Sequence, residues 1–221
     1  MTAREQESLE HRWEAYQQIT NLREHWYWRP GWRPGRSFYT WHLTFAGQPA
    51  LFDLVGTVQG QLHLPGLDLV PLDGLHLTMQ GVGFTDEVSD KDLTAIVASA
   101  RLRCRDLPPV DLNLGPADPD TEGIGLLVSP WAPVERTRLS LREAVGSVWD
   151  AVPEPRQGFR PHVTVAYSGA AVPTTNIRER VRPLRTLPPV AVHLTEVQLI
   201  ALRRGDRVYR WDVVESLPLA G

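Results

Sequence analysis

Apolar and polar residues alternate in several short segments of the chain, and this alternation predicts β-strands. A longer alternating segment is followed by a turn at Arg203–Asp206 and a second alternating segment, which together predict a hairpin. The predicted strands cover residues 38–45, 67–70, 75–80, 110–114, 123–128, 162–167, 190–202 and 208–214.

Between these strands, apolar residues recur at the spacing of an α-helix and predict amphipathic helices. Ser89, with Asp92 three residues later, provides a capping box for one of them. The predicted helices lie near residues 9–19, 51–62, 89–104, 141–149 and 176–184. Strands and helices in this mixed order predict an α+β fold.

Two predicted strands carry the same four-residue pattern, His-x-Thr-x. The first copy is His76-Leu77-Thr78-Met79 and the second is His162-Val163-Thr164-Val165. On a strand, residues i and i+2 point to the same face and lie roughly 6.5–7 Å apart. In each copy we therefore expect a histidine and a threonine to face one way and an apolar side chain to face the other.

The two motifs lie in segments that resemble each other. Each motif strand is followed by a helix, by a strand beginning Leu-Pro-Pro-Val at 107–110 or 187–190, and by a partner strand. A duplicated unit that packs face to face places equivalent residues about a pseudo-two-fold axis. We therefore expect His76 and His162 to share one cleft.

Two further histidines fall in similar patterns, at His42-Leu43-Thr44-Phe45 and His193-Leu194-Thr195-Glu196. His42 is either a functional residue beside the motif histidines or a packing or hydrogen-bonding residue on a neighbouring strand, and we favour the second interpretation. His193 does not align with either motif histidine in the repeat, so we interpret it as an ordinary strand residue.

The segment from Trp26 to Arg36 mixes tryptophan and tyrosine with arginine, glycine and proline. Such a segment can bind phosphate and stack on bases, or its rings can anchor irregular chain over the core. We favour the second interpretation. We accordingly expect residues 1–37 to form a helix and a Trp/Arg-rich segment packed on a single bilobal domain, residues 38–221.

The composition is that of an ordinary globular protein, with 42% hydrophobic residues in a chain of 221. The net charge of −3 gives no global basic field, so an RNA ligand would be bound at a local site. Cys104 is the single cysteine, which suits a reducing cytoplasm and excludes an internal disulfide. We expect a cytoplasmic monomer with no membrane-spanning segment.

Two histidines that face each other provide a base and an acid for displacement at phosphorus, because an imidazole titrates near neutral pH. Threonine hydroxyls can donate hydrogen bonds to the phosphate oxygens. This chemistry needs no metal and no cofactor. A bis-histidine metal site is the alternative, for which His42 could supply a third ligand.

The paired motifs, within 75–84 and 159–168, resemble the two-histidine phosphoesterases, which include bacterial 2′–5′ RNA ligases and RNA 2′,3′-cyclic phosphodiesterases. The resemblance implies a bilobal fold of two antiparallel sheets with flanking helices, related by a pseudo-two-fold axis, and a central cleft. It implies that His162 and His76 are the catalytic base and acid for hydrolysis, and that Thr78 and Thr164 bind phosphate. Three residues beside the motifs either approach the substrate or serve packing and surface roles: Tyr167, Phe84 and Arg160.

The implied substrate is a 2′,3′-cyclic phosphate at the end of RNA or on a nucleotide, and 2′–5′ ligation is the possible reverse activity. Two alternatives stay open at the level of the sequence. One is a non-catalytic module that binds RNA ends or nucleotides. The other is a phosphodiesterase for another small cyclic phosphodiester, such as ADP-ribose cyclic phosphate.

Overall fold

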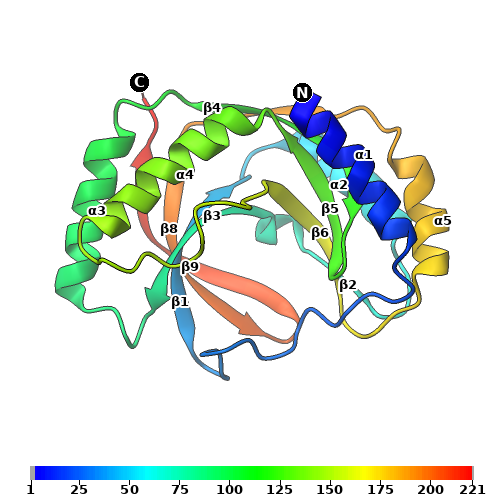
Figure 1. Ribbon diagram of the computed structural model, residues 1–221, viewed down its shortest axis with the longest axis horizontal. Helices are drawn as coiled ribbons and strands as arrows, with labels where there is room; N and C mark the ends of the chain where they lie inside the picture. Colours follow the sequence, from blue (N-terminus) through cyan, green and yellow to red (C-terminus); the bar gives the residue numbers. More distant parts are fainter. Residues whose placement is uncertain (1–2, 221) are drawn as a thin grey trace.

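Two antiparallel sheets form the framework of the protein in the computed structural model, which describes residues 3–220 (Figure 1). The first sheet has the strand order β3 (His76–Phe84), β1 (Ser37–Thr44), β8 (Glu196–Gly205) and β9 (Val208–Pro218). The second has the order β2 (Leu67–Leu69), β6 (His162–Ser168), β5 (Gly123–Ser129), β4 (Val110–Pro119) and β7 (Val190–Leu194). The two antiparallel sheets expected from the sequence are therefore present.

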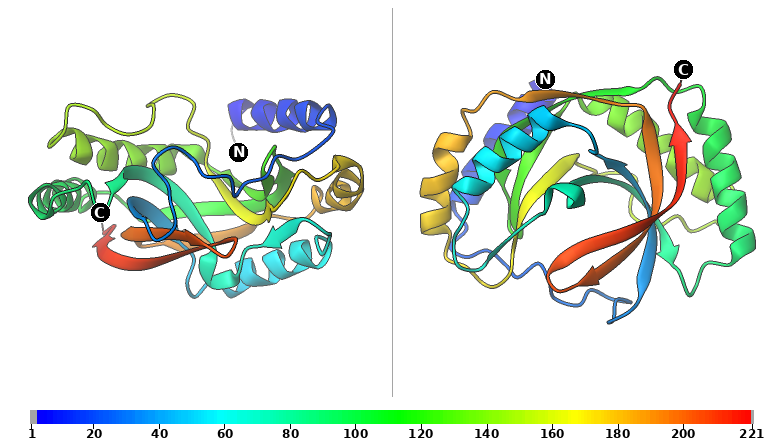
Figure 2. Two further views of the ribbon diagram at one scale, coloured as in Figure 1. Left: turned by 90° about the horizontal axis from the view of Figure 1, so that it is seen from below. Right: turned by 180° about the vertical axis from the view of Figure 1, so that it is seen from behind.

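The helices cover the outside of both sheets (Figure 2). Helices α3 (Asp90–Cys104) and α4 (Trp131–Gly146) pack on each other and against the first sheet. Helices α1 (Ala3–Gln17), α2 (Pro49–Gly60) and α5 (Thr174–Leu184) contact the second sheet, and a short 3₁₀ turn, η1 (Leu72–Gly74), precedes β3. No helix within residues 3–220 is both long enough and apolar enough to cross a bilayer.

The motif strands occupy equivalent places in the two sheets. Strand β3 pairs with β1 and strand β6 pairs with β5, both antiparallel. The first sheet is completed by β8 and β9 from the C-terminal part of the chain, and the second sheet includes β2 from the N-terminal part. Each sheet therefore combines strands from both halves of the chain, which ties the two lobes together.

The predicted strand 190–202 is wrong in one respect, because it is two strands that belong to different sheets. Strand β7 ends at Leu194 in the second sheet and β8 begins at Glu196 in the first. The alternation of apolar residues changes parity at Thr195 and Glu196, which is where the chain changes sheet. The two Leu-Pro-Pro-Val segments are not equivalents in the two lobes either, since the strands they open, β4 and β7, both lie in the second sheet, where they pair with each other.

Alternation along the motif strands separates a core face from a cleft face. Leu77 and Met79 on β3 are fully buried, and so are Val163 and Val165 on β6. This leaves the histidine and the threonine of each motif on the opposite face, as the spacing predicts. The predicted cap of α3 is also confirmed, because the Ser89 side chain accepts a hydrogen bond from the backbone N–H of Asp92 at 3.1 Å.

Residues 18–36, here called the N-terminal strap, run from the end of α1 to the start of β1, past the edges of both sheets (Figure 1). The strap is attached to the second sheet, where the His25 N–H donates to the Ser168 carbonyl at 2.8 Å, and Leu22 is buried in the core. Farther along, Trp32 packs against Phe38. The strap therefore bridges the two lobes beside the cleft.

Candidate active site

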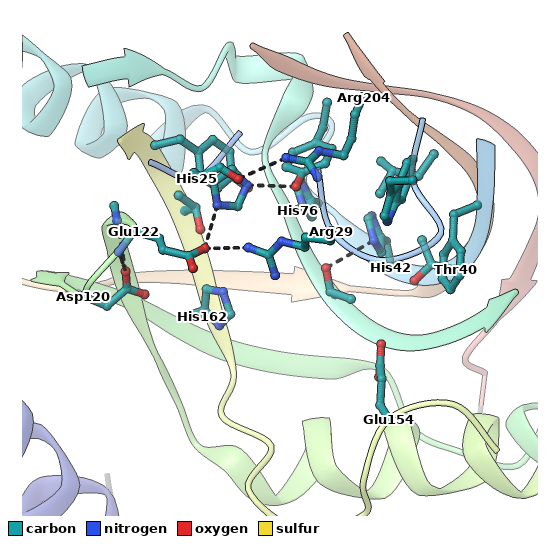
Figure 3. A pocket seen from close by; sticks show the side chains of 18 of the residues that line it. His25, Arg29, Thr40, His42, His76, Asp120, Glu122, Glu154, His162 and Arg204 are labelled. Atoms are coloured by element: carbon teal, nitrogen blue, oxygen red, sulfur yellow. Dashed lines mark hydrogen bonds and ion pairs between the residues drawn. The ribbon is translucent and has the colours of Figure 1, made fainter. Parts of the chain in front are cut away.

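A cleft of about 420 Å³ lies between the two sheets and contains both motifs (Figure 3). Each side chain comes from a different part of the framework. The first sheet contributes His42, His76 and Thr78, the second contributes His162 and Thr164, and the strap contributes His25, Arg29 and Trp32. The fold thus brings together the four motif residues that the sequence singled out.

The same kind of hydrogen bond orients both motif histidines. Nδ1 of His76 lies 2.8 Å from the carbonyl oxygen of Gly74, and Nδ1 of His162 lies 3.0 Å from that of Arg160. A carbonyl can only accept, so each Nδ1 carries the proton and donates it. In both neutral rings Nε2 then bears the free lone pair.

Burial holds the pKa of both motif histidines below the ordinary value of 6.5. The pKa of His76 falls to about 4, chiefly because protein surrounds the ring and further because a charged His162 repels a second proton. Burial also lowers the pKa of His162; the carboxylate of Asp120 opposes that shift and the guanidinium of Arg12 adds to it. Asp120 thus favours a proton on His162, whereas the family resemblance implies that His76 carries it.

His42 lies directly beside this pair, on β1. Its ring stacks on that of His76 with the centroids 4.5 Å apart and the planes 4° from parallel. It is fully buried, and burial holds its pKa well below 6.5, so it is neutral. Nε2 of His42 lies 3.3 Å from the hydroxyl oxygen of Thr78, while its Nδ1 has no hydrogen-bond partner in the described part of the chain.

The tautomer of His42 decides what Thr78 can do. An orphaned buried N–H is rarer than an under-satisfied acceptor, which favours the proton on Nε2. His42 then donates to the Thr78 oxygen and leaves the Thr78 O–H free to donate into the cleft. Among the residues that the structure describes, no three His, Cys, Asp or Glu side chains converge as metal ligands.

The remaining sequence candidates differ in their placement. Tyr167 lines the cleft, with its ring stacked on that of His25 at 4.0 Å. Phe84 packs against Trp32 and is not among the lining residues, which is the packing role. The Arg160 guanidinium lies 3.6 Å from Asp120, and Arg160 itself is not among the lining residues.

His193 is outside the cleft, on β7. It is exposed, and its Nδ1 lies 2.7 Å from an Asp111 carboxylate oxygen. This agrees with its interpretation as an ordinary strand residue.

The strap and several acidic residues line the cleft, although neither was expected there from the sequence. Arg29 and Trp32 belong to the aromatic and arginine-rich segment that was assigned a packing role, and the structure shows that they also line the cleft. The composition of that segment was the sequence feature that could have identified them as site residues. Five other lining residues gave no signal, because they lie in turns and on strands without a motif: Asp120, Glu122, Glu154, Arg204 and Tyr209.

The model of the 2′–5′ RNA ligase superfamily matches residues 47–206, which is more than half of the chain. The chain belongs to this superfamily of two-histidine phosphoesterases. The matched range contains both motifs, whereas His42 and the strap precede it. No curated protein matches the chain.

Solved structures show the same fold at low sequence identity. TT0787 of Thermus thermophilus matches with a TM-score of 0.64 and 18% identity, over 83% of this chain and 98% of that one. E. coli LigT in its apo form matches with a TM-score of 0.61 and 19% identity, over 84% of this chain and 99% of that one. The phosphoesterase fold therefore extends over nearly the full length of these proteins.

Proposed function

We propose that the protein hydrolyses 2′,3′-cyclic phosphates at the ends of RNA or on nucleotides, without a metal ion or cofactor. The observation that carries the proposal is the pair of imidazoles, each fixed through Nδ1 to a backbone carbonyl and each lining the same cleft as a motif threonine. E. coli LigT, which shares the fold, forms crystalline complexes with phosphate and with 3′-AMP. Those ligands support a phosphate or nucleotide ligand for this cleft as well.

In the proposed reaction, Nε2 of one imidazole removes a proton from water as the water oxygen attacks phosphorus. The bond from phosphorus to one ribose oxygen breaks, and Nε2 of the other imidazolium protonates that oxygen. The product is a phosphate monoester on the remaining ribose oxygen. Because Asp120 favours the proton on His162, we assign His162 as the acid and His76 as the base. A ribose 5′-hydroxyl in place of water would give a 2′–5′ linkage.

The threonines would bind the non-bridging oxygens of the phosphate. Thr78 is exposed within the cleft and Thr164 is half-buried. His42 would act through Thr78, by donating to its oxygen so that the hydroxyl proton is free for the phosphate. Preorganised donors of this kind stabilise charge that develops at phosphorus without reorganising during the reaction.

A second candidate keeps the chemistry and changes the substrate to a small cyclic phosphodiester such as ADP-ribose cyclic phosphate. The observation that favours it is the balance of charge in the cleft, where two arginines face three carboxylates, those of Asp120, Glu122 and Glu154. Such a cleft accommodates one phosphate group more readily than a run of RNA phosphates. We further propose that the protein acts as a monomer in the cytoplasm.

The test is hydrolysis of a 2′,3′-cyclic mononucleotide by the pure protein in EDTA, with His76→Ala and His162→Ala compared against His193→Ala. We expect turnover by wild type and by His193→Ala, and a loss of at least about a hundredfold in either motif variant. Saturable binding without product would instead support the binding module. Turnover that is unchanged in His76→Ala would remove the proposed mechanism.

A further inference from the structure

Neither motif strand carries a permanent positive charge. Strands β3 and β6 contain no lysine or arginine, and both motif imidazoles are held towards the neutral form. A phosphate in the cleft needs a cation from elsewhere. Of the described residues that line the cleft, two are arginines, Arg29 in the strap and Arg204 on β8.

The terminal nitrogens of Arg204 already donate hydrogen bonds within the protein. Its two terminal nitrogens donate to the backbone carbonyls of Tyr27 at 3.2 Å and His25 at 3.0 Å. The residue is 7% exposed, and its guanidinium lies within 6 Å of the centroids of the Trp26, Trp32 and Tyr209 rings. Arg204 therefore fixes the strap to the first sheet.

Arg29 retains capacity for a ligand. Its side chain is 40% exposed, and one terminal nitrogen donates to the Glu122 carboxylate at 2.5 Å. Its Nε is buried and has no hydrogen-bond partner within the described residues, so the capacity for a ligand lies in the exposed part of the side chain. In Figure 3 the side chain extends into the space bounded by His25, His76 and His162.

The position of Arg29 is fixed by a chain of hydrogen bonds. His25 is neutral, since burial lowers its pKa to about 3, so one ring nitrogen donates and the other accepts. Its Nδ1 lies 3.1 Å from Glu122, which can only accept, and its Nε2 lies 2.8 Å from the Tyr209 hydroxyl. Nδ1–H therefore donates to Glu122 and Tyr209 donates to Nε2. Glu122, held in this way, orients the guanidinium.

We propose that Arg29 is the phosphate-binding cation of this cleft, so that the strap is part of the substrate site. The proposal rests on the proposed function for the identity of the ligand, a phosphate ester held between the two motif histidines. A guanidinium matches phosphate oxygens in geometry and charge. Residue 29 precedes the range matched by the superfamily model, so this contribution comes from a segment outside the shared unit.

The test measures binding of inorganic phosphate by calorimetry in wild type, Arg29→Gln, Arg29→Lys and the matched control Arg33→Gln. Arg33 lies on the same strap, is 69% exposed and pairs with Asp86 outside the cleft. We expect Arg29→Gln to weaken phosphate binding about ten- to a hundredfold, Arg29→Lys to restore part of it, and Arg33→Gln to stay within about twofold. Binding by Arg29→Gln within about twofold of wild type, or an equal loss in Arg33→Gln, would overturn the proposal.

A second measurement uses only the wild-type protein and therefore tests the proposal even if a variant does not fold. Phenylglyoxal modifies accessible arginines, and peptide mass spectrometry reports the extent at Arg29 and Arg33. We expect phosphate to protect Arg29 and not Arg33, and equal labelling of Arg29 with and without phosphate would contradict the proposal. If phosphate binds through Arg29 but wild type does not hydrolyse a 2′,3′-cyclic nucleotide, the proposed function fails and this inference stands.

Discussion

The pH dependence of kcat/KM is the most direct readout of the two-histidine arrangement. Hydrolysis requires one neutral and one protonated imidazole, so kcat/KM follows the fraction of free enzyme that carries a single proton on the pair. The pKa of His76 is about 4 and that of His162 lies below 6.5, because desolvation in the cleft disfavours the charged form of both rings. We therefore expect an acidic optimum, between about pH 4 and pH 6.5.

The size of the decrease in kcat/KM at alkaline pH follows from the higher of the two pKa values. Above it the active fraction falls tenfold for each pH unit, so kcat/KM at pH 8 is expected at no more than about one-thirtieth of its maximum. Below pH 4 both rings are protonated and the rate falls again. A bound phosphodiester is an anion and raises the pKa of both rings, so the alkaline limb of kcat lies at a higher pH than that of kcat/KM.

The assay follows hydrolysis of uridine 2′,3′-cyclic phosphate from pH 3.5 to 8.5 at constant ionic strength, since neither the base nor the cyclic phosphate titrates over most of this range. Thr78→Ala serves as the control, because it lowers the rate without moving either limb. A value of kcat/KM that is constant or rises between pH 6.5 and pH 8 would refute the reasoning. The single-proton pair would then not be the catalytic form of the free enzyme.

Three further predictions follow. Because an aryl leaving group needs no acid, we expect His162→Ala to retain hydrolysis of bis(p-nitrophenyl) phosphate and His76→Ala to lose it; equal losses would contradict the assigned roles. We expect His42→Ala and Thr78→Ala each to lower kcat about tenfold, with no further loss in the double variant, since both changes remove the Thr78 hydroxyl as a donor to phosphate. Additive losses of kcat in kinetic assays would show that His42 does not act through Thr78. We expect Gly123→Ala to lower the free energy of unfolding in urea by about 1–3 kcal/mol, because its Cβ would lie 2.4 Å from a backbone carbonyl oxygen of β6; an unchanged midpoint would show that β5 can shift.

Local patterns that can be recognised directly in the sequence determined much of the fold. Alternation located the motif strands β3 and β6, helical spacing with the Ser89 cap located α3, and the paired His-x-Thr motifs indicated the family. These features depend on residues two to four positions apart, whose relative directions are set by backbone geometry alone. For the same reason the spacing within each motif suffices to place its histidine and threonine on one face of the strand.

Tertiary structure decided where pairing departs from simple alternation. In the pairing of β6 with β5, Thr164 and Ala166 face consecutive residues of β5, which leaves Val165 as an extra residue. Such a bulge reverses the side-chain parity along the strand. Tyr167 therefore lines the same cleft as His162, although strict alternation would send it to the other face.

The electrostatics of the site were also beyond the sequence. Asp120, which favours the proton on His162, is 42 residues away from it in the chain. Arg29 is oriented by Glu122, which lies in the turn between β4 and β5, 93 residues away in the chain. The sequence thus determined which groups can perform the chemistry, since a strand fixes the direction of its own side chains. Only the fold decided which charges surround them, because charge acts through space between residues that are distant along the chain.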